Sequence, residues 1–158
     1  MQKITPCLWF DDQAEDAAKF YTSVFKNSSI GAVSRYSEGM PMPAGTVLTV
    51  AFTLDGQEFT ALNGGPQFTF SEAISFQIDC GDQAEVDEYW NRLTADGGEE
   101  SQCGWLKDKF GMSWQIVPSD LEKYIGGPDT DGAHRAVQAM MQMRKLDIDV
   151  IRQAYEQA

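Results

Sequence analysis

The tetrapeptide DQAE stands at Asp12–Glu15 and again at Asp82–Glu85, seventy positions further along the chain (82 − 12 = 70). In both places an alternating apolar segment precedes it, and an apolar stripe at helical spacing follows it. An Asp followed three residues later by Glu is typical of a capping box, in which the two side chains satisfy backbone N–H groups of the first turn. We therefore predict that a helix begins at each copy, with Asp12 and Asp82 as N-caps.

The segments around the two copies repeat in the same order. Strands are predicted at residues 4–10, 30–36, 46–54 and 58–63 around the first copy, and at 74–80 and in two parts of 104–118 around the second. Hairpin turns at Gly56 and Gly111 take corresponding places. Duplication of one βαβββ unit explains this order. It predicts an α+β fold and a single domain over 1–158, with a first unit at 1–65, a second at 72–118 and a helical tail at 119–158.

The composition excludes several classes of partner. The formal net charge is −12, and the 12 Lys and Arg residues are scattered, so we expect neither nucleic acid nor an anionic membrane surface as partner. No apolar run approaches eighteen residues, which predicts no transmembrane helix. The first residues, MQKITP, show no secretory leader, and the three cysteines form no C-x-x-C pair. We therefore expect a cytoplasmic protein with free thiols.

The tail has a helical pattern. A capping box at Ser119–Glu122 predicts a short helix, and residues 131–146 and 147–158 predict two more, the last capped by Asp147. Three methionines are clustered in it: Met140, Met141 and Met143. They have two interpretations, a promiscuous binding surface or contacts within a core or between subunits, and the second is favoured.

Four stretches together are similar to one known family: ITPCLWFDDQAEDAAKFYTSVFKNS, LNGGPQFTFSEAISF, DKFGMSWQIVP and AMMQMRKLDID. With the two βαβββ units, they resemble the vicinal oxygen chelate superfamily, which includes glyoxalase I, extradiol dioxygenases and bleomycin-resistance proteins. The closest resemblance is to its PhnB-like branch, often labelled 3-demethylubiquinone-9 3-methyltransferase. That label gains little support from the residues, because no G-x-G turn follows a strand as a nucleotide-binding methyltransferase would need.

The resemblance implies that the two sheets form one cup-shaped mixed sheet, with the helices outside and the ligand on the concave face. Strand alternation then predicts which side chains face the cup. From the first unit these are Thr5, Cys7, Trp9, Glu58, Thr60 and Leu62, and from the second Ser75, Gln77, Asp79, Ser113, Gln115 and Val117.

Metal-using members of the superfamily hold a divalent ion with one side chain from each of four strands. Distances from the repeated landmarks carry these positions over to Thr5, Thr60, Ser75 and Gln115. Only Gln115 is a credible ligand type, since neutral hydroxyls bind Zn, Ni or Fe poorly. We therefore expect no metal and no other cofactor. An alternative site of Glu58, Asp79 and Gln115 stays open.

Other candidates are weaker. Cys7 could be a cavity nucleophile but has no histidine nearby in sequence, and the only histidine, His134, is in the tail. Glu58 or Asp79 could be a general base, or an ordinary carboxylate at the rim of the cup. Aromatic residues suit either a flat, apolar ligand or core packing, and these are Trp9, Phe68, Phe70 and Trp105. The glycine- and aromatic-rich NGGPQFTF stretch is typical of a loop over a pocket mouth.

The sequence thus predicts a protein that binds a small molecule in the cup without metal. The alternatives are an enzyme of the lyase, isomerase or dioxygenase type, and a methyltransferase. The resemblance also implies a homodimer, because each unit leaves sheet edges unpaired. The residues predicted to bind the ligand are Thr5, Cys7, Trp9, Glu58, Thr60, Phe68, Phe70, Ser75, Gln77, Asp79, Trp105 and Gln115.

Overall fold

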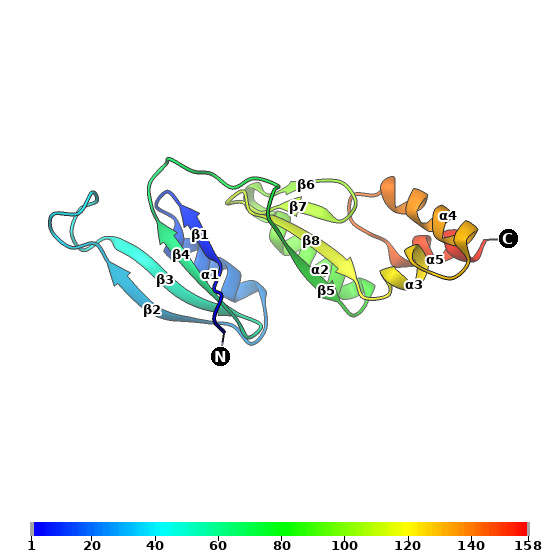
Figure 1. Ribbon diagram of the computed structural model, residues 1–158, viewed down its shortest axis with the longest axis horizontal. Helices are drawn as coiled ribbons and strands as arrows, with labels where there is room; N and C mark the ends of the chain where they lie inside the picture. The colour runs from blue at the N-terminus through cyan, green and yellow to red at the C-terminus, as the bar shows by residue number, and fades with distance from the viewer. Residues whose placement is uncertain (1, 158) are drawn as a thin grey trace. The chain divides into compact units, whose positions relative to one another are not determined.

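The computed structural model describes residues 2–157 and contains two units, which divide after Phe70 (Figure 1). Each unit contains a four-stranded sheet with one long helix against it, in the order βαβββ. The predicted α+β fold of two tandem βαβββ units is therefore confirmed.

The first unit has its parallel strand pair at one edge. Its elements are β1 (Cys7–Phe10), α1 (Ala14–Val24), β2 (Ser29–Arg35), β3 (Val47–Leu54) and β4 (Gln57–Asn63). The strand order is β1-β4-β3-β2, with β1 parallel to β4 and the other pairs antiparallel. The β3–β4 turn is the predicted Asp-Gly hairpin, since Asp55 and Gly56 both have the positive φ that a tight primed turn requires.

The core of the first unit lies between α1 and one sheet face. Ala14, Ala17, Ala18, Tyr21 and Val24 of the predicted helical stripe are buried, whereas Phe25, its last member, follows α1 and is half-buried. Tyr21 stacks on Phe52 of β3 at 6.1 Å between ring centroids, and Phe52 stacks on Phe59 of β4 at 5.3 Å. Three small alanines bring the helix close to the sheet, so that these aromatic rings can interdigitate.

The second unit repeats this topology. Its elements are β5 (Ser75–Cys80), α2 (Gln83–Thr94), a 3₁₀ turn η1 (Ala95–Gly97), β6 (Glu99–Glu100), β7 (Trp105–Lys107) and β8 (Ser113–Pro118). The order is β5-β8-β7-β6, with β5 parallel to β8 as β1 is to β4. Val86, Trp90 and Leu93 of α2 are buried, as their helical spacing predicts, whereas Tyr89 of the same predicted stripe is half-buried. The two-residue β6 was not expected from the sequence.

The first strand is shorter than predicted. Residues 4–6 precede β1, and the side chain of Ile4 is 85% exposed. The sheet nevertheless begins to pair at Pro6, whose carbonyl oxygen accepts from the backbone N–H of Thr60 at 2.9 Å. Proline has no N–H to donate in return, so regular pairing starts one residue later.

The two DQAE copies begin their helices in different ways. Asp82 Oδ1 accepts from the backbone N–H of Glu85 at 2.9 Å, and Glu85 Oε1 accepts from that of Gly81 at 3.2 Å. In the first copy the N-cap is Gln13, with no side-chain cap, and Asn63 Oδ1 accepts from Ala14 N at 2.8 Å. The capping prediction is right for Asp82 and wrong for Asp12, because the buried amide of Asn63 occupies that position instead.

This difference predicts unequal effects from the same substitution. Asp82→Ala should lower the free energy of unfolding of the second unit by about 1 kcal/mol, because one N-terminal N–H loses its acceptor. Asp12→Ala should change that of the first unit by only a few tenths, roughly the scale of an ordinary surface substitution. Urea titration followed by amide NMR signals of each unit measures both. Equal losses would mean that Asp12 also caps in solution.

The tail consists of α3 (Leu121–Ile125), α4 (Thr130–Met141) and α5 (Ile148–Glu156). Asp147 caps α5 as predicted, accepting from Asp149 N and Val150 N. The Ser119–Glu122 capping box is wrong, because Ser119 Oγ donates to Asp79 Oδ1 and to Cys80 O instead. The predicted 131–146 helix also ends early, at Met141. No helix within residues 2–157 is long and apolar enough to cross a membrane.

The tail has its own small core. Leu121, Ala136, Leu146 and Ile151 are buried together. Met140 and Met143 pack against this group, whereas Met141 is 59% exposed. Two of the three methionines are therefore core residues, which is the interpretation that the sequence favoured.

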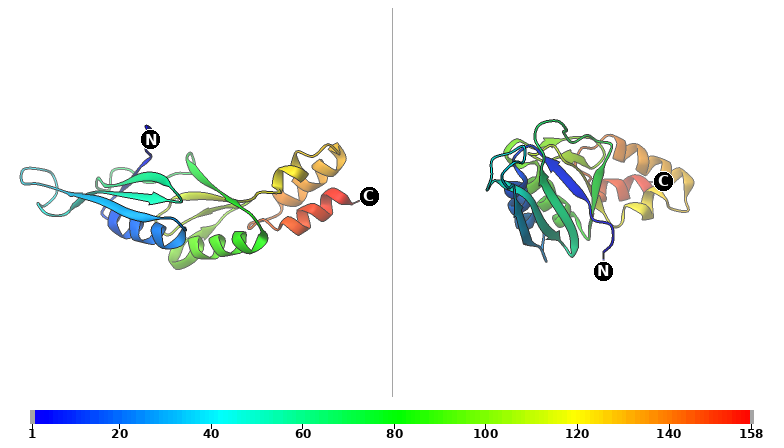
Figure 2. Two further views of the ribbon diagram at one scale, coloured as in Figure 1. Left: turned by 90° about the horizontal axis from the view of Figure 1, so that it is seen from below. Right: turned by 60° about the vertical axis from the view of Figure 1, so that its left-hand side comes forward.

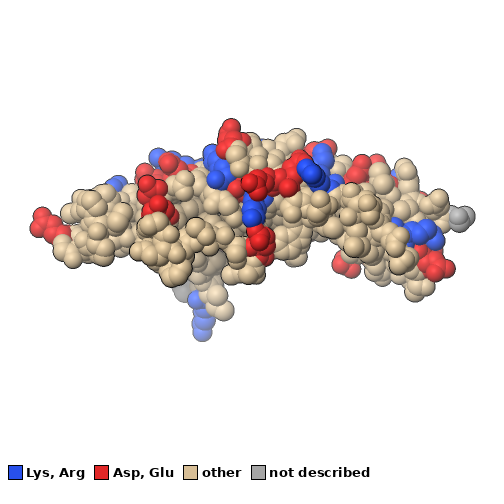
Figure 3. Space-filling model, turned by 90° about the horizontal axis from the view of Figure 1, so that it is seen from above, with Lys and Arg blue, Asp and Glu red and all other residues tan. Residues whose placement is uncertain are grey.

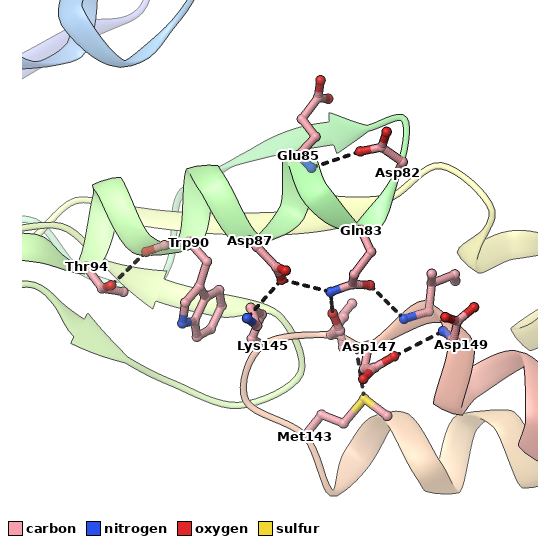
Figure 4. A network of polar contacts seen from close by, with 12 residues as sticks. Asp82, Gln83, Glu85, Asp87, Trp90, Thr94, Met143, Lys145, Asp147 and Asp149 are labelled. Atoms are coloured by element: carbon pink, nitrogen blue, oxygen red, sulfur yellow. Dashed lines mark hydrogen bonds and ion pairs between the residues drawn. The ribbon is translucent and has the colours of Figure 1, made fainter.

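Gln83 joins the tail to α2 (Figure 4). Its Nε2 donates to Asp87 Oδ1 at 3.1 Å and to Leu146 O at 2.9 Å, while its Oε1 accepts from Ile148 N at 2.9 Å. Lys145 Nζ lies 2.8 Å from the same Asp87 oxygen and holds the pKa of that carboxyl below its usual value. The second DQAE copy thus both starts a helix and holds the tail against it.

Candidate functional site

Each sheet has one face covered by its helix, α1 or α2, and an opposite face that we call the helix-free face (Figure 2). Side chains alternate between the two faces along every strand. On β1, Leu8 and Phe10 are buried toward α1, which leaves Cys7 and Trp9 on the helix-free face. The assignment of strand faces made from the sequence is thus correct for Cys7–Phe10 of β1. On β8, Val117, which was assigned to the cup, packs against the core of the tail.

In the first unit, Trp9 is held by the connection that follows β4. Its Nε1 donates to Gly65 O at 2.9 Å, and Phe68 packs edge-on against its ring at 4.9 Å between centroids. The ring also lies directly over Gly64, where an added Cβ would come within 2.4 Å of a ring carbon. The side chain of Phe68 is 64% exposed, so Trp9 and Phe68 present an accessible aromatic pair.

Phe70, also predicted to contact a ligand, lies elsewhere. Its ring packs edge-on against Phe10 at 5.2 Å, and Phe10 is a core residue on the helix side of the sheet. The NGGPQFTF connection therefore has two anchors, Phe68 at Trp9 and Phe70 at Phe10.

The other predicted residues of the first unit are spread along the strands. Cys7 is paired in register with Thr60, Thr5 is exposed before β1, and Glu58 is exposed at the start of β4. Partial burial raises the pKa of the Cys7 thiol. A thiol with a raised pKa stays protonated near pH 7, which disfavours Cys7 as a nucleophile.

In the second unit, the predicted residues form a connected polar group. Gln115 Nε2 donates to Ser75 Oγ at 2.9 Å, and Gln77 Nε2 lies 3.4 Å from Gln115 Oε1. Trp105 of β7 is the register partner of Gln115 and extends this group with an aromatic ring. Asp79 lies at the far end of β5 and accepts from Ser119. The structure thus brings Ser75, Gln77, Gln115 and Trp105 together.

Two residues that were not predicted to bind a ligand lie beside this group. Ser113 and Lys107 are register partners on β8 and β7, and Ser113 is also the partner of Ser75. Lys107 forms an ion pair with Glu72. The period-two pattern could have found Lys107, because it stands two residues after Trp105 on the same strand.

A buried carboxylate shapes the hairpin that carries these residues. Asp108, 2% exposed, accepts from Phe110 N at 2.9 Å and Met112 N at 3.1 Å through Oδ1, and from Trp114 Nε1 at 2.8 Å through Oδ2. Lys107 and Ser113 flank this turn. Asp108 therefore sets the register that places them opposite each other.

The residues at the superfamily's metal positions do not fit a divalent ion. Ser75 and Gln115 bond to each other, and Thr5 and Thr60 belong to the other unit. Together they offer three hydroxyls and one amide, without the imidazole, thiolate or carboxylate ligands that Zn, Ni or Fe prefer. Within residues 2–157, no three His, Cys, Asp or Glu side chains gather as a metal site would require.

Charged side chains are mixed over the surface. On the side drawn in Figure 3, Lys and Arg lie beside Asp and Glu without forming a broad basic area. Lys145 pairs with Asp87, and Arg144 with Glu100. A shallow hollow of about 520 Å³ lies on α5, between Val150 and Gln157, and contains none of the predicted site residues.

Residues 2–117 match the protein family described as 3-demethylubiquinone-9 3-methyltransferase. A PhnB protein from Bacillus cereus, described under the same methyltransferase name, is 39% identical over 74% of this chain and 99% of its own, with a TM-score of 0.67. Two more distant structures show the fold alone.

A Pseudomonas aeruginosa protein is 18% identical over 75% of this chain and 98% of its own, with a TM-score of 0.61. The fosfomycin resistance protein FosX from Listeria monocytogenes, solved with Mn(II) and sulfate, is 17% identical over 80% and 98%, with a TM-score of 0.54. A comparison with curated proteins gave no match.

The family match includes both βαβββ units and ends at residue 117, so all three helices of the tail lie beyond it. It spans the Trp9 and Phe68 pair, the Ser75–Gln115 group and the Asp108 hairpin. With the identity to the Bacillus cereus protein, this shows that the chain belongs to the 3-demethylubiquinone-9 3-methyltransferase family, which includes that PhnB protein.

Proposed function

We propose that this protein binds a small organic molecule on the helix-free faces of its sheets, without the superfamily's metal ion and without methyl transfer. The observation that carries the proposal is the Ser75–Gln115–Gln77 group beside Trp105. A few convergent polar groups next to an aromatic ring are typical of small-molecule sites. In the first unit, the accessible Trp9–Phe68 pair offers a separate apolar surface for a small molecule.

The donor set supports a role without metal. The hydroxyls and amide at the four carried-over positions can orient a ligand by hydrogen bonds but are poor ligands for Lewis-acid metals. Glu58 and Asp79 remain as candidate bases for an enzyme of the same superfamily. Asp79 accepts from Ser119, and Glu58 is exposed, so neither has the desolvated environment that a general base near pH 7 needs.

The methyltransferase reading of the family name has less support. Nucleotide-binding methyltransferases of the usual kind need a glycine turn between a parallel strand and a helix. Here Gly64–Gly65 does follow a strand, β4, but it leads into an irregular connection, and the ring of Trp9 covers Gly64. Neither sheet has a doubly wound parallel order.

We also propose a cytoplasmic homodimer. The three cysteines are free thiols, as expected in a reducing compartment. Strands β1 and β5 each stand at the edge of their sheet, and such edges are commonly paired in assemblies. Size-exclusion chromatography with light scattering should give twice the 17.6 kDa chain mass, and a single chain mass would contradict the dimer.

The test of the binding proposal uses the four tryptophans as internal reporters. Protein purified without tag or chelator is first analysed for metal and then titrated with a library of small fragments, followed by the indole N–H signals in ¹H–¹⁵N spectra. Binding on the helix-free faces should shift the Trp9 or Trp105 signal. Trp90 and Trp114, which are buried on the helix sides, should not move.

Three outcomes would contradict the proposal. If the purified protein contains one tightly bound metal ion per chain, metal-dependent chemistry becomes the better explanation. Calorimetric binding of S-adenosylmethionine would restore methyl transfer. Fragments that shift only signals outside the helix-free faces would place the site elsewhere.

A further inference from the structure

We infer that the helix-free face of the second unit contains an anion subsite, formed by Lys107, Ser113 and Ser75, for the carboxylate or phosphonate group of a small organic ligand. This inference rests on the function proposed above and names the ligand class.

The first observation is a buried hydroxyl without a partner. Ser113 is 1% exposed, and its Oγ is the single buried side-chain N or O atom without a hydrogen bond in the described part of the chain, residues 2–157. Buried polar atoms are almost always bonded, so an orphan of this kind indicates a missing partner. Its neighbours Trp114 and Ile116 are buried on the opposite side of β8, and Gln115, two residues on, bonds to Ser75. Alternation therefore directs Ser113 to the helix-free face.

The second observation is the row in which Ser113 lies. Across the sheet, Ser75 of β5, Ser113 of β8 and Lys107 of β7 are direct register partners, so their side chains lie side by side on one face. Ser75 Oγ accepts from Gln115, which leaves its proton available to donate. Two hydroxyl donors next to an ammonium group suit an anionic oxygen acceptor.

The third observation is that a carboxylate already lies at this position. Glu72 forms an ion pair with Lys107. Lys107 lowers the pKa of the Glu72 carboxyl, and Glu72 raises the pKa of the Lys107 ammonium, so both groups are charged near pH 7. The two side chains are 60% and 38% exposed. Exposed ion pairs are weak, so a ligand anion can exchange with Glu72 at small cost. Glu72 thus occupies the Lys107 end of the subsite and leaves the Ser113 hydroxyl without a partner.

A second acidic group beside Lys107 does not prevent the exchange. Glu99 of β6 is the register partner of Lys107, and its charge adds to the rise in the Lys107 pKa that the hydrogen bond with Glu72 mainly causes. When a ligand anion replaces Glu72, one negative charge beside Lys107 replaces another. The local charge balance is preserved even in a chain of net charge −12.

The neighbouring row indicates the body of the ligand. Trp105 lies two residues from Lys107 on the same face of β7, which is about 7 Å along the strand. Its partner Gln115 and then Gln77 continue the row toward β5. A ligand with one ring next to its anionic group can therefore reach Lys107 and Trp105 together.

The test compares charged and neutral probes of one size. Phenylphosphonate and benzoate are titrated into the full-length protein at low salt, with benzamide as the neutral match, and the Trp105 indole N–H signal is followed. We expect the two anions to shift it at lower concentrations than benzamide. Lys107→Met should weaken anion binding about tenfold, and Ser113→Ala about three- to tenfold, since each removes a donor to a charged acceptor.

Glu72→Gln is the decisive variant, because it changes an exposed residue and should leave folding intact. We expect it to strengthen anion binding about threefold by freeing Lys107. Each variant has a control with the same change in net charge. Lys109→Met, on the adjacent turn, matches Lys107→Met, and Glu88→Gln, on α2, matches Glu72→Gln. Both controls should leave the affinities unchanged.

The outcomes separate this inference from the proposed function. If benzamide shifts Trp105 as well as the anions do, the face binds ligands but the anion subsite is wrong. If Glu72→Gln weakens anion binding, or changes the affinity no more than Glu88→Gln does, the inference that a ligand anion exchanges with Glu72 is wrong. If no probe shifts Trp105, the anion subsite is wrong, while binding of other molecules at Trp9 remains open to the fragment screen.

Discussion

Replacing Asp108 by alanine is expected to lower the free energy of unfolding of the second unit by about 4 kcal/mol. The substitution removes the acceptor of two backbone N–H groups, from Phe110 and Met112, and of the Trp114 indole. Asp108 is 2% exposed, and the bonds that it accepts from Met112 N and from the Trp114 indole are buried, so these two freed donors stay out of reach of water. Each unsatisfied buried donor costs roughly 1–3 kcal/mol, so the donors that lose Asp108 together account for a loss of about 4 kcal/mol.

Urea unfolding followed by amide NMR signals of the second unit measures this loss. Asp108→Asn should cost about half as much, because its amide oxygen can still accept from both backbone groups and only the indole loses its partner. The matched control is Asp131→Ala, at an exposed position in the first turn of α4, which should change stability by only about 0.5 kcal/mol. A loss below about 1 kcal/mol for Asp108→Ala would mean that water reaches the turn.

Gly64→Ala is expected to lower the stability of the first unit by about 2–3 kcal/mol. The new Cβ would lie 2.4–2.5 Å from three carbons of the Trp9 ring, well inside contact distance. Trp9 cannot turn away freely, since its Nε1 is bonded to Gly65 O and its ring packs on Phe68. The ring or the connection must shift, and the Trp9–Phe68 pair should separate.

The measurement is again unit-specific urea unfolding, together with the chemical shift of the Trp9 indole. Gly81→Ala is the matched control, because a Cβ there meets nothing within 4 Å. Adding Trp9→Leu to Gly64→Ala should recover part of the loss, since the smaller side chain leaves room for the methyl group. Unchanged stability with an unchanged Trp9 signal would contradict the close packing seen here.

Local periodicity was sufficient to predict the main elements. The buried stripe of α1 follows from apolar residues three and four positions apart, and the turn at Asp55–Gly56 follows from the backbone freedom of that pair. Both depend on neighbours within a few residues. The side chains on the helix-free faces, such as Trp9 and Gln115, could be placed for the same reason, because alternation along a strand is a local property.

Partners of polar side chains were harder to predict. Asp12 and Asp82 stand in the same tetrapeptide, yet only Asp82 caps its helix. Asn63, 49 residues from Ala14, takes the role of Asp12. Ser119 likewise bonds back to β5 instead of capping α3. A local motif competes with any acceptor that the fold brings close, and spacing cannot reveal that competitor.

The same contrast between local patterns and long-range contacts holds for the candidate site. Its faces and most of its residues, Ser75, Gln77, Trp105 and Gln115, could be read from the alternating pattern. The orphaned hydroxyl of Ser113 and the Glu72–Lys107 pair could not, because the first depends on how the strands surround Ser113 and the second on where the turn before β5 brings Glu72.

The amino-acid sequence by itself therefore determined the duplicated βαβββ architecture, the two helical stripes and the face on which each strand residue lies. These are consequences of short-range periodicity, which the backbone geometry of helices and strands imposes. Tertiary structure alone decided which donors meet which acceptors: Asn63 at α1, Gln83 at the tail, Asp108 at its hairpin and Glu72 at Lys107. Hydrogen bonds and ion pairs act over about 3 Å, so they exist only after folding has brought distant residues together.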